Sequence, residues 1–226
     1  AAPVIVAKDA DMSPMVEGLV KGGFYHAGQV CVSVQRIFAE ESIIDELATN
    51  LTEKASKLIV GDPTKIETQV GPLIRPQEVK RVDEWVKEAE RSGGEILTGG
   101  ELISDSCYQP TVIFGAPGNV NVSSKEIFGP VVCLNSYKDI DEAILKANSL
   151  PFAFQASVFT SDIDLAMKVY SKLDASAVMI NDHTAFRVDW MPFAGCRQSG
   201  HGVGGIPYTI HEMQIHKMMV LKSKNL

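Results

Sequence analysis

The sequence lacks the cysteine and histidine patterns that disulfide frameworks and metal sites need. Its four cysteines (Cys31, Cys107, Cys133 and Cys196) lie far apart with no CxxC spacing, and its five histidines include no HExxH pair. This spacing argues against a disulfide framework and a zinc site, so we expect no metal. Scattered single cysteines are typical of a reducing compartment, which predicts a cytoplasmic protein.

Long apolar runs and blocks of positive charge are also missing. No apolar stretch approaches the length of a bilayer span, and no basic region leads into an apolar core at the start of the chain. The net charge is −7, with no cluster of Lys and Arg. We therefore expect neither a membrane nor a nucleic-acid partner.

What the chain does contain is strand-like segments that alternate with amphipathic ones. Its 226 residues can bury a sizeable core, and 45% of them are hydrophobic. This alternation predicts an α/β fold with a mostly parallel, open sheet flanked by helices. We expect strands at 3–7, 36–40, 110–114, 131–137, 155–160 and 175–181, and helices near 9–25, 41–58, 76–94, 139–149 and 162–173.

The C-terminal part has its own features. Residues 175–181 are almost continuously apolar, which predicts a strand covered on both faces. The glycine-rich stretch 195–205 predicts a loop. Residues 213–223 alternate loosely and predict an edge strand.

The stretch FYHAGQVCVSVQR (24–36) raises the first question about chemistry, because it sets Cys31 just after Gly28. Gly28 permits a tight turn and a close backbone approach, and Val30 and Val32 are suited to lining an apolar pocket. A cysteine at such a turn can be a nucleophile. Free cysteines are also among the most buried and inert residues, so the local sequence leaves both interpretations open.

A second candidate is SSKEIFGPVV (123–132). Its Glu126 precedes Phe128 and a Gly-Pro bend that leads into the strand 131–137. A carboxylate there can accept hydrogen bonds from ribose hydroxyls, and an aromatic ring can pack on a flat cofactor ring. The alternative is a solvated Lys125–Glu126 pair beside a core phenylalanine.

The third candidate is NDHTAFRVDWMPFAG (181–195). Asn181 ends a predicted strand, where α/β proteins often place ligand contacts, and Phe193 begins a shaped, glycine-rich loop. Arg187 can meet an anionic group or form a surface ion pair. The glycines lack the spacing of a phosphate-binding loop.

Together, FYHAGQVC, KEIFGP and NDHTAFRVDWMPFAG resemble the NAD(P)-dependent aldehyde dehydrogenase superfamily. The similarity extends over essentially the whole chain, through APVIVAKDADM, VGPLI, YQPTVI, NSLPFAFQASVFTSD and PFAGCRQSGHG. It implies the fold of that family's catalytic domain, with NAD or NADP as the cofactor and a small aldehyde as the substrate.

The resemblance also implies roles for individual residues. Cys31 matches the nucleophile that forms a thiohemiacetal with the aldehyde and, after hydride transfer, a thioester that water hydrolyses. Its backbone N–H would be one oxyanion donor, worth about 3 kcal/mol. Glu126 and Phe128 match cofactor-binding positions. The substrate pocket implied by the resemblance is lined by Val30, Val32, Asn181, His183, Arg187 and Phe193, with Asn181 more structural than chemical.

The resemblance further implies that the chain is one part of a longer enzyme. We expect a thiol-bearing catalytic domain over 1–212 and an oligomerisation strand and tail over 213–226, which would build a homodimer or homotetramer. The family's general-base glutamate, in an ELGG sequence, and its cofactor-binding domain would precede Ala1. Without them we expect the isolated chain to be inactive.

Three functions stay open at this stage. The first is hydrolytic aldehyde oxidation, the second is a CoA-acylating relative, and the third is a non-enzymatic folding or assembly module. His183 and Arg187 suggest a hydroxylated or anionic aldehyde, such as a lactaldehyde, semialdehyde or phosphonate type. Val203 and Gly204, where many relatives have Arg-Glu, indicate only altered loop anchoring.

Overall fold

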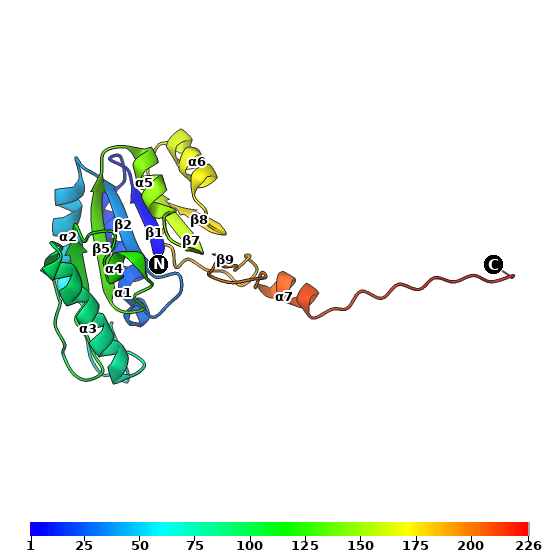
Figure 1. The fold of residues 1–226 in the computed structure, drawn as a ribbon, viewed down its shortest axis with the longest axis horizontal. Coiled ribbons are helices and arrows are strands. Elements are labelled where there is room, and N and C mark those ends of the chain that lie inside the picture. Colours follow the sequence, from blue (N-terminus) through cyan, green and yellow to red (C-terminus); the bar gives the residue numbers. More distant parts are fainter. Residues whose placement is uncertain (226) are drawn as a thin grey trace.

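A seven-stranded sheet forms the centre of the protein (Figure 1). The computed structural model describes residues 1–225. The strand order is β3-β4-β5-β2-β1-β7-β8, and every neighbouring pair is parallel except β3–β4. The mostly parallel open sheet predicted from the sequence is therefore confirmed. Its strands are β1 (Ala2–Val6), β2 (Val34–Glu40), β3 (Glu95–Thr98), β4 (Thr111–Phe114), β5 (Val131–Tyr137), β7 (Gln155–Phe159) and β8 (Ala177–Ile180).

Helices cover both faces of this sheet (Figure 1). Val4 and Ile37 belong to the larger apolar cluster, which includes α1, and their strand neighbours Ile5 and Phe38 belong to the cluster of α5. Adjacent residues of one strand are thus buried on opposite faces, as in other sheets with helices on both sides. The helices are α1 (Met12–Phe24), η1 (Tyr25–Gly28, 3₁₀), α2 (Ile44–Ser56), α3 (Pro76–Arg91), α4 (Asn121–Ser124), α5 (Ile140–Ala147), α6 (Ile163–Lys172) and α7 (Ile206–Glu212).

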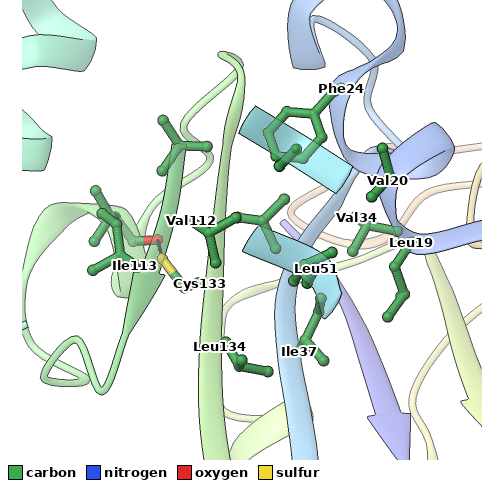
Figure 2. Close-up of a cluster of buried hydrophobic side chains, with 14 of the residues drawn as sticks. Leu19, Val20, Phe24, Val34, Ile37, Leu51, Val112, Ile113, Cys133 and Leu134 are labelled. Carbon is green, nitrogen blue, oxygen red and sulfur yellow. Dashed lines mark hydrogen bonds between the residues drawn. The ribbon is translucent and has the colours of Figure 1, made fainter. Parts of the chain in front are cut away.

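The larger cluster fixes α1 against the middle of the sheet. Figure 2 shows Leu19 of α1 next to Val34 of β2, with Phe24 above them and Leu51 and Ile37 below, and all five belong to one cluster. All five side chains are buried. Burying an apolar side chain of this size contributes about 1.5–3 kcal/mol. This packing holds the end of α1, from which the Cys31 loop departs.

One prediction about the C-terminal part is wrong, and the oligomerisation strand over 213–226 stays a prediction. β8 lies at the edge of the sheet, and 41% of Ile180 is exposed, so its apolar run does not mark a strand covered on both faces. Residues 214–223 form no strand with any part of the described chain. They leave the body as an extended segment after α7 (Figure 1), because a strand needs a partner for its backbone groups.

The 195–205 segment is a loop, as predicted, with one addition. Two residues, β9 (Cys196–Arg197), pair antiparallel with β6 (Phe152–Ala153). Within residues 1–225, no helix is long and apolar enough to cross a membrane.

Candidate active site

Cys31 lies in a loop whose backbone is reversed by three left-handed residues. His26, Ala27 and Gly28 have φ values of 50°, 55° and 70°. A turn then carries Cys31, closed by a hydrogen bond from Ser33 N–H to Val30 O of 2.9 Å. Cys31 is half-buried. The left-handed region is costly for residues other than glycine, so this conformation depends on the surrounding contacts.

Gly28 brings this loop into direct contact with the EIFGP segment. A Cβ added at Gly28 would lie 2.0 Å from the carbonyl oxygen of Gly129. Only a glycine permits the approach, because that distance is far below van der Waals contact. Two motifs distant in the sequence therefore share one backbone contact.

Side-chain hydrogen bonds also hold the Cys31 loop in place. Ser33 Oγ donates to the carbonyl of Gly22 at 3.1 Å, which ties the Cys31 turn to α1. Gln29 donates to Pro72 O at 3.2 Å and accepts from Ile74 N–H at 2.9 Å. The loop thus has anchors on two sides.

Gln35 holds the EIFGP segment from beneath. Its side-chain amide donates to Val122 O at 3.0 Å and to Lys125 O at 2.7 Å, and its carbonyl accepts from Ile127 N–H at 3.1 Å. Gln35 is 4% exposed, so these three bonds satisfy a buried amide. They set the backbone on either side of Glu126.

Cys31 and Glu126 line one cleft of about 210 Å³. The cleft lies at the amino ends of the parallel strands, since both residues precede the strands they lead into, β2 and β5. No hydrogen bond within residues 1–225 involves the Cys31 thiol or its backbone N–H. The remaining lining comes from the start of β1, the segment 152–155, Ala147, Asp174, Ala175, Gln198 and Ser199.

One cleft residue is a buried amide with no partner. Gln155 is 0% exposed, and neither its Nε2 nor its Oε1 forms a hydrogen bond within the described chain. An unsatisfied buried polar group costs about 1–3 kcal/mol. Gln155 is therefore a destabilising, unsatisfied polar residue in the lining of the cleft.

Phe128 and Val30 flank a narrow crevice beside the cleft. They line it together with Gly28 and Glu126. Phe128 is 40% exposed. Its φ of 47° is a left-handed backbone conformation that is unfavourable for a residue with a Cβ. Val32, by contrast, is 4% exposed and packs inside.

Asn181 is absent from the lining of this cleft, and its place in a substrate pocket stays a prediction. It follows β8, at the carboxyl edge of the sheet, and its amide pairs with the backbone of Thr160 through two hydrogen bonds of 2.9 Å. These bonds hold Asn181 at a φ of 58°. Its place is structural.

The chain then runs back toward the Cys31 loop through residues 181–195, here called the return segment. Asp182 O accepts from Ser157 Oγ on β7, and Thr184 Oγ1 donates to Val32 O at 2.6 Å. Thr184 is fully buried and is the last buried residue of the described chain. This bond joins the return segment to the turn that carries Cys31.

His183 packs against α1, outside the cleft lining. A Cβ added at Gly22 would lie 2.8 Å from its Cβ, and its Nδ1 accepts from Ala185 N–H at 3.1 Å. Burial lowers the pKa of His183 below 6.5, with Asp182 acting in the opposite direction and Lys21 in the same one. The packed imidazole therefore binds its proton less tightly than a free histidine does.

Arg187 and Phe193 form a stack that reaches the cleft through a third residue. The guanidinium of Arg187 lies 4.2 Å from the ring centroid of Phe193, and the rings of Phe193 and Phe154 are 4.7 Å apart. Phe154 lines the cleft, and the other two do not. The stack thus places an exposed cation at the outer side of the cleft wall.

The chain matches the aldehyde dehydrogenase family over residues 1–219. The chain belongs to the aldehyde dehydrogenase family. It is 40% identical to 3-sulfolactaldehyde dehydrogenase of Priestia megaterium, over 96% of this chain and 45% of that protein. Lactaldehyde dehydrogenase of Methanococcus maripaludis (strain C5) is also 40% identical, over 97% of this chain and 47% of that protein.

A solved structure shows the same relationship for the fold. It is glyceraldehyde-3-phosphate dehydrogenase GapN of Methanocaldococcus jannaschii, complexed with NADP, with a TM-score of 0.90 and 37% identity. The match covers 94% of this chain and 46% of that one. This aldehyde dehydrogenase family chain therefore spans about half the length of the relatives it matches.

Two residues that support the site were missed at the sequence level. Gln35 and Thr184 act through bonds to Val122 and Val32, which are 87 and 152 positions away. A polar residue inside an apolar strand pattern was the available signal for Gln35. In this aldehyde dehydrogenase family chain, no three His, Cys, Asp or Glu side chains of residues 1–225 gather as a metal site.

Proposed function

We propose that the whole protein oxidises an aldehyde to a carboxylic acid, with Cys31 as the nucleophile. The observation that carries the proposal is that Cys31 and Glu126 line the same cleft. The family membership supports it, and so do the relatives whose names state aldehyde oxidation.

The Cys31 thiolate attacks the aldehyde carbon, and a thiohemiacetal forms. The oxyanion that develops is stabilised by the Cys31 N–H, which bonds to no group within residues 1–225 and so is available. One such donor is worth about 3 kcal/mol. Loss of hydride leaves a thioester, which water cleaves to the acid while the thiol is restored.

The cofactor we propose is NAD or NADP, which supplies the hydride acceptor when bound. Glu126 and Phe128 fit this role. The Glu126 side chain is 42% exposed in the cleft and can accept hydrogen bonds from ribose hydroxyls, and the exposed Phe128 ring offers a flat apolar face. The GapN structure was solved with NADP.

The base that activates water is proposed to come from outside this chain. Glu126 and Asp174 are the acidic residues of the cleft lining, and neither forms a hydrogen bond with Cys31 within the described residues. Thioester hydrolysis needs a base within hydrogen-bonding reach of the water. We therefore expect this chain alone to show no steady turnover.

The test compares the full-length protein with its Cys31→Ala variant. We expect Cys31→Ala to lower kcat by about 10³-fold or more, and Cys196→Ser to leave it within about twofold. Cys196 is a matched control because it is also half-buried. Turnover by Cys31→Ala, or by residues 1–226 alone, would contradict the proposal, as would transfer of the acyl group to CoA in place of water.

For the substrate, we propose a small hydroxylated or anionic aldehyde. Arg187 supports this class, because its guanidinium is exposed and is oriented by the Phe193 and Phe154 rings next to the cleft. The relatives named for sulfolactaldehyde and lactaldehyde act on aldehydes of this kind.

The substrate class is tested by kcat/KM for phosphonylated, carboxylated and neutral short aldehydes. Arg187→Ala should lower the values for the anionic compounds by about tenfold and leave the neutral ones unchanged. Arg91→Ala, on the exposed side of α3, is the control. Equal values for all three classes, unaffected by Arg187→Ala, would rule the class out.

We further propose that the tail assembles the protein as a homodimer or homotetramer. Ile215, Met218, Met219 and Val220 are each more than 80% exposed. An apolar extended segment of this kind is suited to pairing with a strand of another subunit.

A further inference from the structure

One wall of the Cys31 cleft includes two very short antiparallel strands that lie far apart in the sequence. β6 (Phe152–Ala153) and β9 (Cys196–Arg197) pair over two residues only. Gln198 and Ser199, which follow β9, face the cleft that also contains Cys31. Beyond the two paired residues, Gln198 N–H donates to Pro151 O at 3.0 Å and Ser199 Oγ accepts from Ala153 N–H at 3.1 Å. So short a pairing is weak by itself, and further contacts outside it support the wall.

Arg197 supplies further contacts for this pair of strands. Its Nε donates to Asp174 Oδ2, and its Nη1 donates to Asn148 O at 2.8 Å and to Leu150 O at 2.6 Å. One guanidinium thus joins β9 to the loop after α5 and to the loop after α6. The planar fork of donors allows this, and a lysine ammonium could not reach all three acceptors with the same geometry.

The two loops are also joined to each other. Asn148 Oδ1 accepts from Asp174 N–H at 2.9 Å, and Asn148 Nδ2 donates to Lys172 O at 2.8 Å. The acceptors of Arg197 therefore form a braced corner, and the guanidinium is attached to a rigid support.

The backbone of the wall is strained. The hydrogen bonds of Arg197 to Asp174, Asn148 and Leu150, here called the clamp, counteract this strain. Arg197 has a φ of 54°, a left-handed conformation that is unfavourable for a residue with a Cβ. A Cβ added at Gly195 would lie 2.5 Å from the Ser199 carbonyl. The segment 195–199 is folded tightly on itself, and external bonds must keep it so.

We propose that Arg197 is a positioning residue that sets the place of Gln198 and Ser199 in the wall of the Cys31 cleft, through its hydrogen bonds to Asp174, Asn148 and Leu150. The proposal rests on the proposed function only in that it takes this cleft to be the active site. If the clamp opens, the wall moves away and Cys31 becomes more accessible.

The first test is limited trypsin digestion followed by peptide mapping. Asp174→Asn keeps the shape of the side chain and removes its charge, so cleavage after Arg197 should become about fivefold faster, as expected for loss of one such ion pair. Cleavage after Arg187, exposed on the return segment, is the internal reference. Asp141→Asn is the matched variant, because Asp141 pairs with Lys168 and Lys172 and is absent from the cleft lining.

The second test measures iodoacetamide alkylation of Cys31 in the same variants. Asp174→Asn and Arg197→Met should raise its rate by about the same factor, Arg197→Lys should give a value between parent and Arg197→Met, and Asp141→Asn should change nothing. Buried Cys107 reports any general unfolding. Arg197→Lys carries the test if Asp174→Asn fails to fold.

Unchanged cleavage after Arg197, or faster cleavage without faster Cys31 alkylation, would overturn the proposal. Neither measurement needs turnover. A failure of the proposed oxidation is therefore distinguishable from a failure of the clamp.

Discussion

Two regions meet at the Cys31 cleft, and they differ in the fraction of their residues that is buried. The anchor region, residues 22–36 and 125–132, contains Ala27, Gln35 and Ile127, each at most 4% exposed. After Thr184, by contrast, no residue up to 225 is buried. The anchor region is therefore held by packing within this chain, and the later part is held by single hydrogen bonds and stacks.

This difference in burial predicts that the anchor region is rigid and that the part after Thr184 is less so. A close-packed contact tolerates almost no added volume, because protein interiors are as dense as organic crystals. An exposed ion pair contributes little and can open locally. Substitutions should thus have large effects at Gly28 and progressively smaller ones toward the tail.

The largest effect is expected for Gly28→Ala. The new Cβ meets the Gly129 carbonyl at 2.0 Å and forces a side chain into a φ of 70°. Overpacking and left-handed strain together should lower the free energy of unfolding by about 3 kcal/mol or more, measured by urea titration. Gly93→Ala separates the two causes, since its Cβ would meet nothing within 4 Å at a φ of 103°. Equal losses for both variants would remove the contact with Gly129 from the explanation.

The next effect concerns the joint between the regions. Thr184→Val removes the hydroxyl that donates to Val32 O at 2.6 Å and leaves that carbonyl without the bond. We expect a loss of about 1–2 kcal/mol in the free energy of unfolding. The same change in Thr49, whose hydroxyl donates to Asp45 O on the exposed side of α2, should stay within about 0.5 kcal/mol. A loss at Thr184 no larger than at Thr49 would mean that the joint is not formed.

The sequence was most informative where both faces of an element are covered. The bounds 131–137 of β5 were predicted correctly because that strand is buried on both sides. β8 has a similar apolar run but lies at an edge, a property of the sheet order that one strand cannot encode. Cys31 and Glu126, which their motifs singled out, line one cleft, and each motif contains a glycine at the contact between the two loops. Gln35 and Thr184 were not found, because their partners are distant in the sequence.

A smaller, pH-dependent effect is expected at His183. Its pKa is lowered by burial in the folded protein, so the unfolded chain binds more protons just below pH 6.5. The contribution of the neutral His183 to the free energy of unfolding is therefore fully present above pH 6.5 and decreases as the pH falls below it. His183→Asn keeps an acceptor for Ala185 N–H and should flatten the urea midpoint between about pH 5 and 7. His201→Gln, an exposed control, should keep the slope of the parent, and a slope unchanged in His183→Asn would contradict the assignment.

The smallest effect on stability is expected for deletion of residues 214–225. These residues pair with no strand of the described chain, and Ile215 is 94% exposed. Removing them deletes no buried contact, so the free energy of unfolding should change by less than about 0.5 kcal/mol. Association should change instead, because the exposed apolar tail is the surface proposed to pair with another subunit. Light scattering over a range of concentrations measures association. A deletion that lowers the free energy of unfolding would mean that the tail packs on its own chain, and a deletion that leaves association unchanged would contradict the proposed role of the tail.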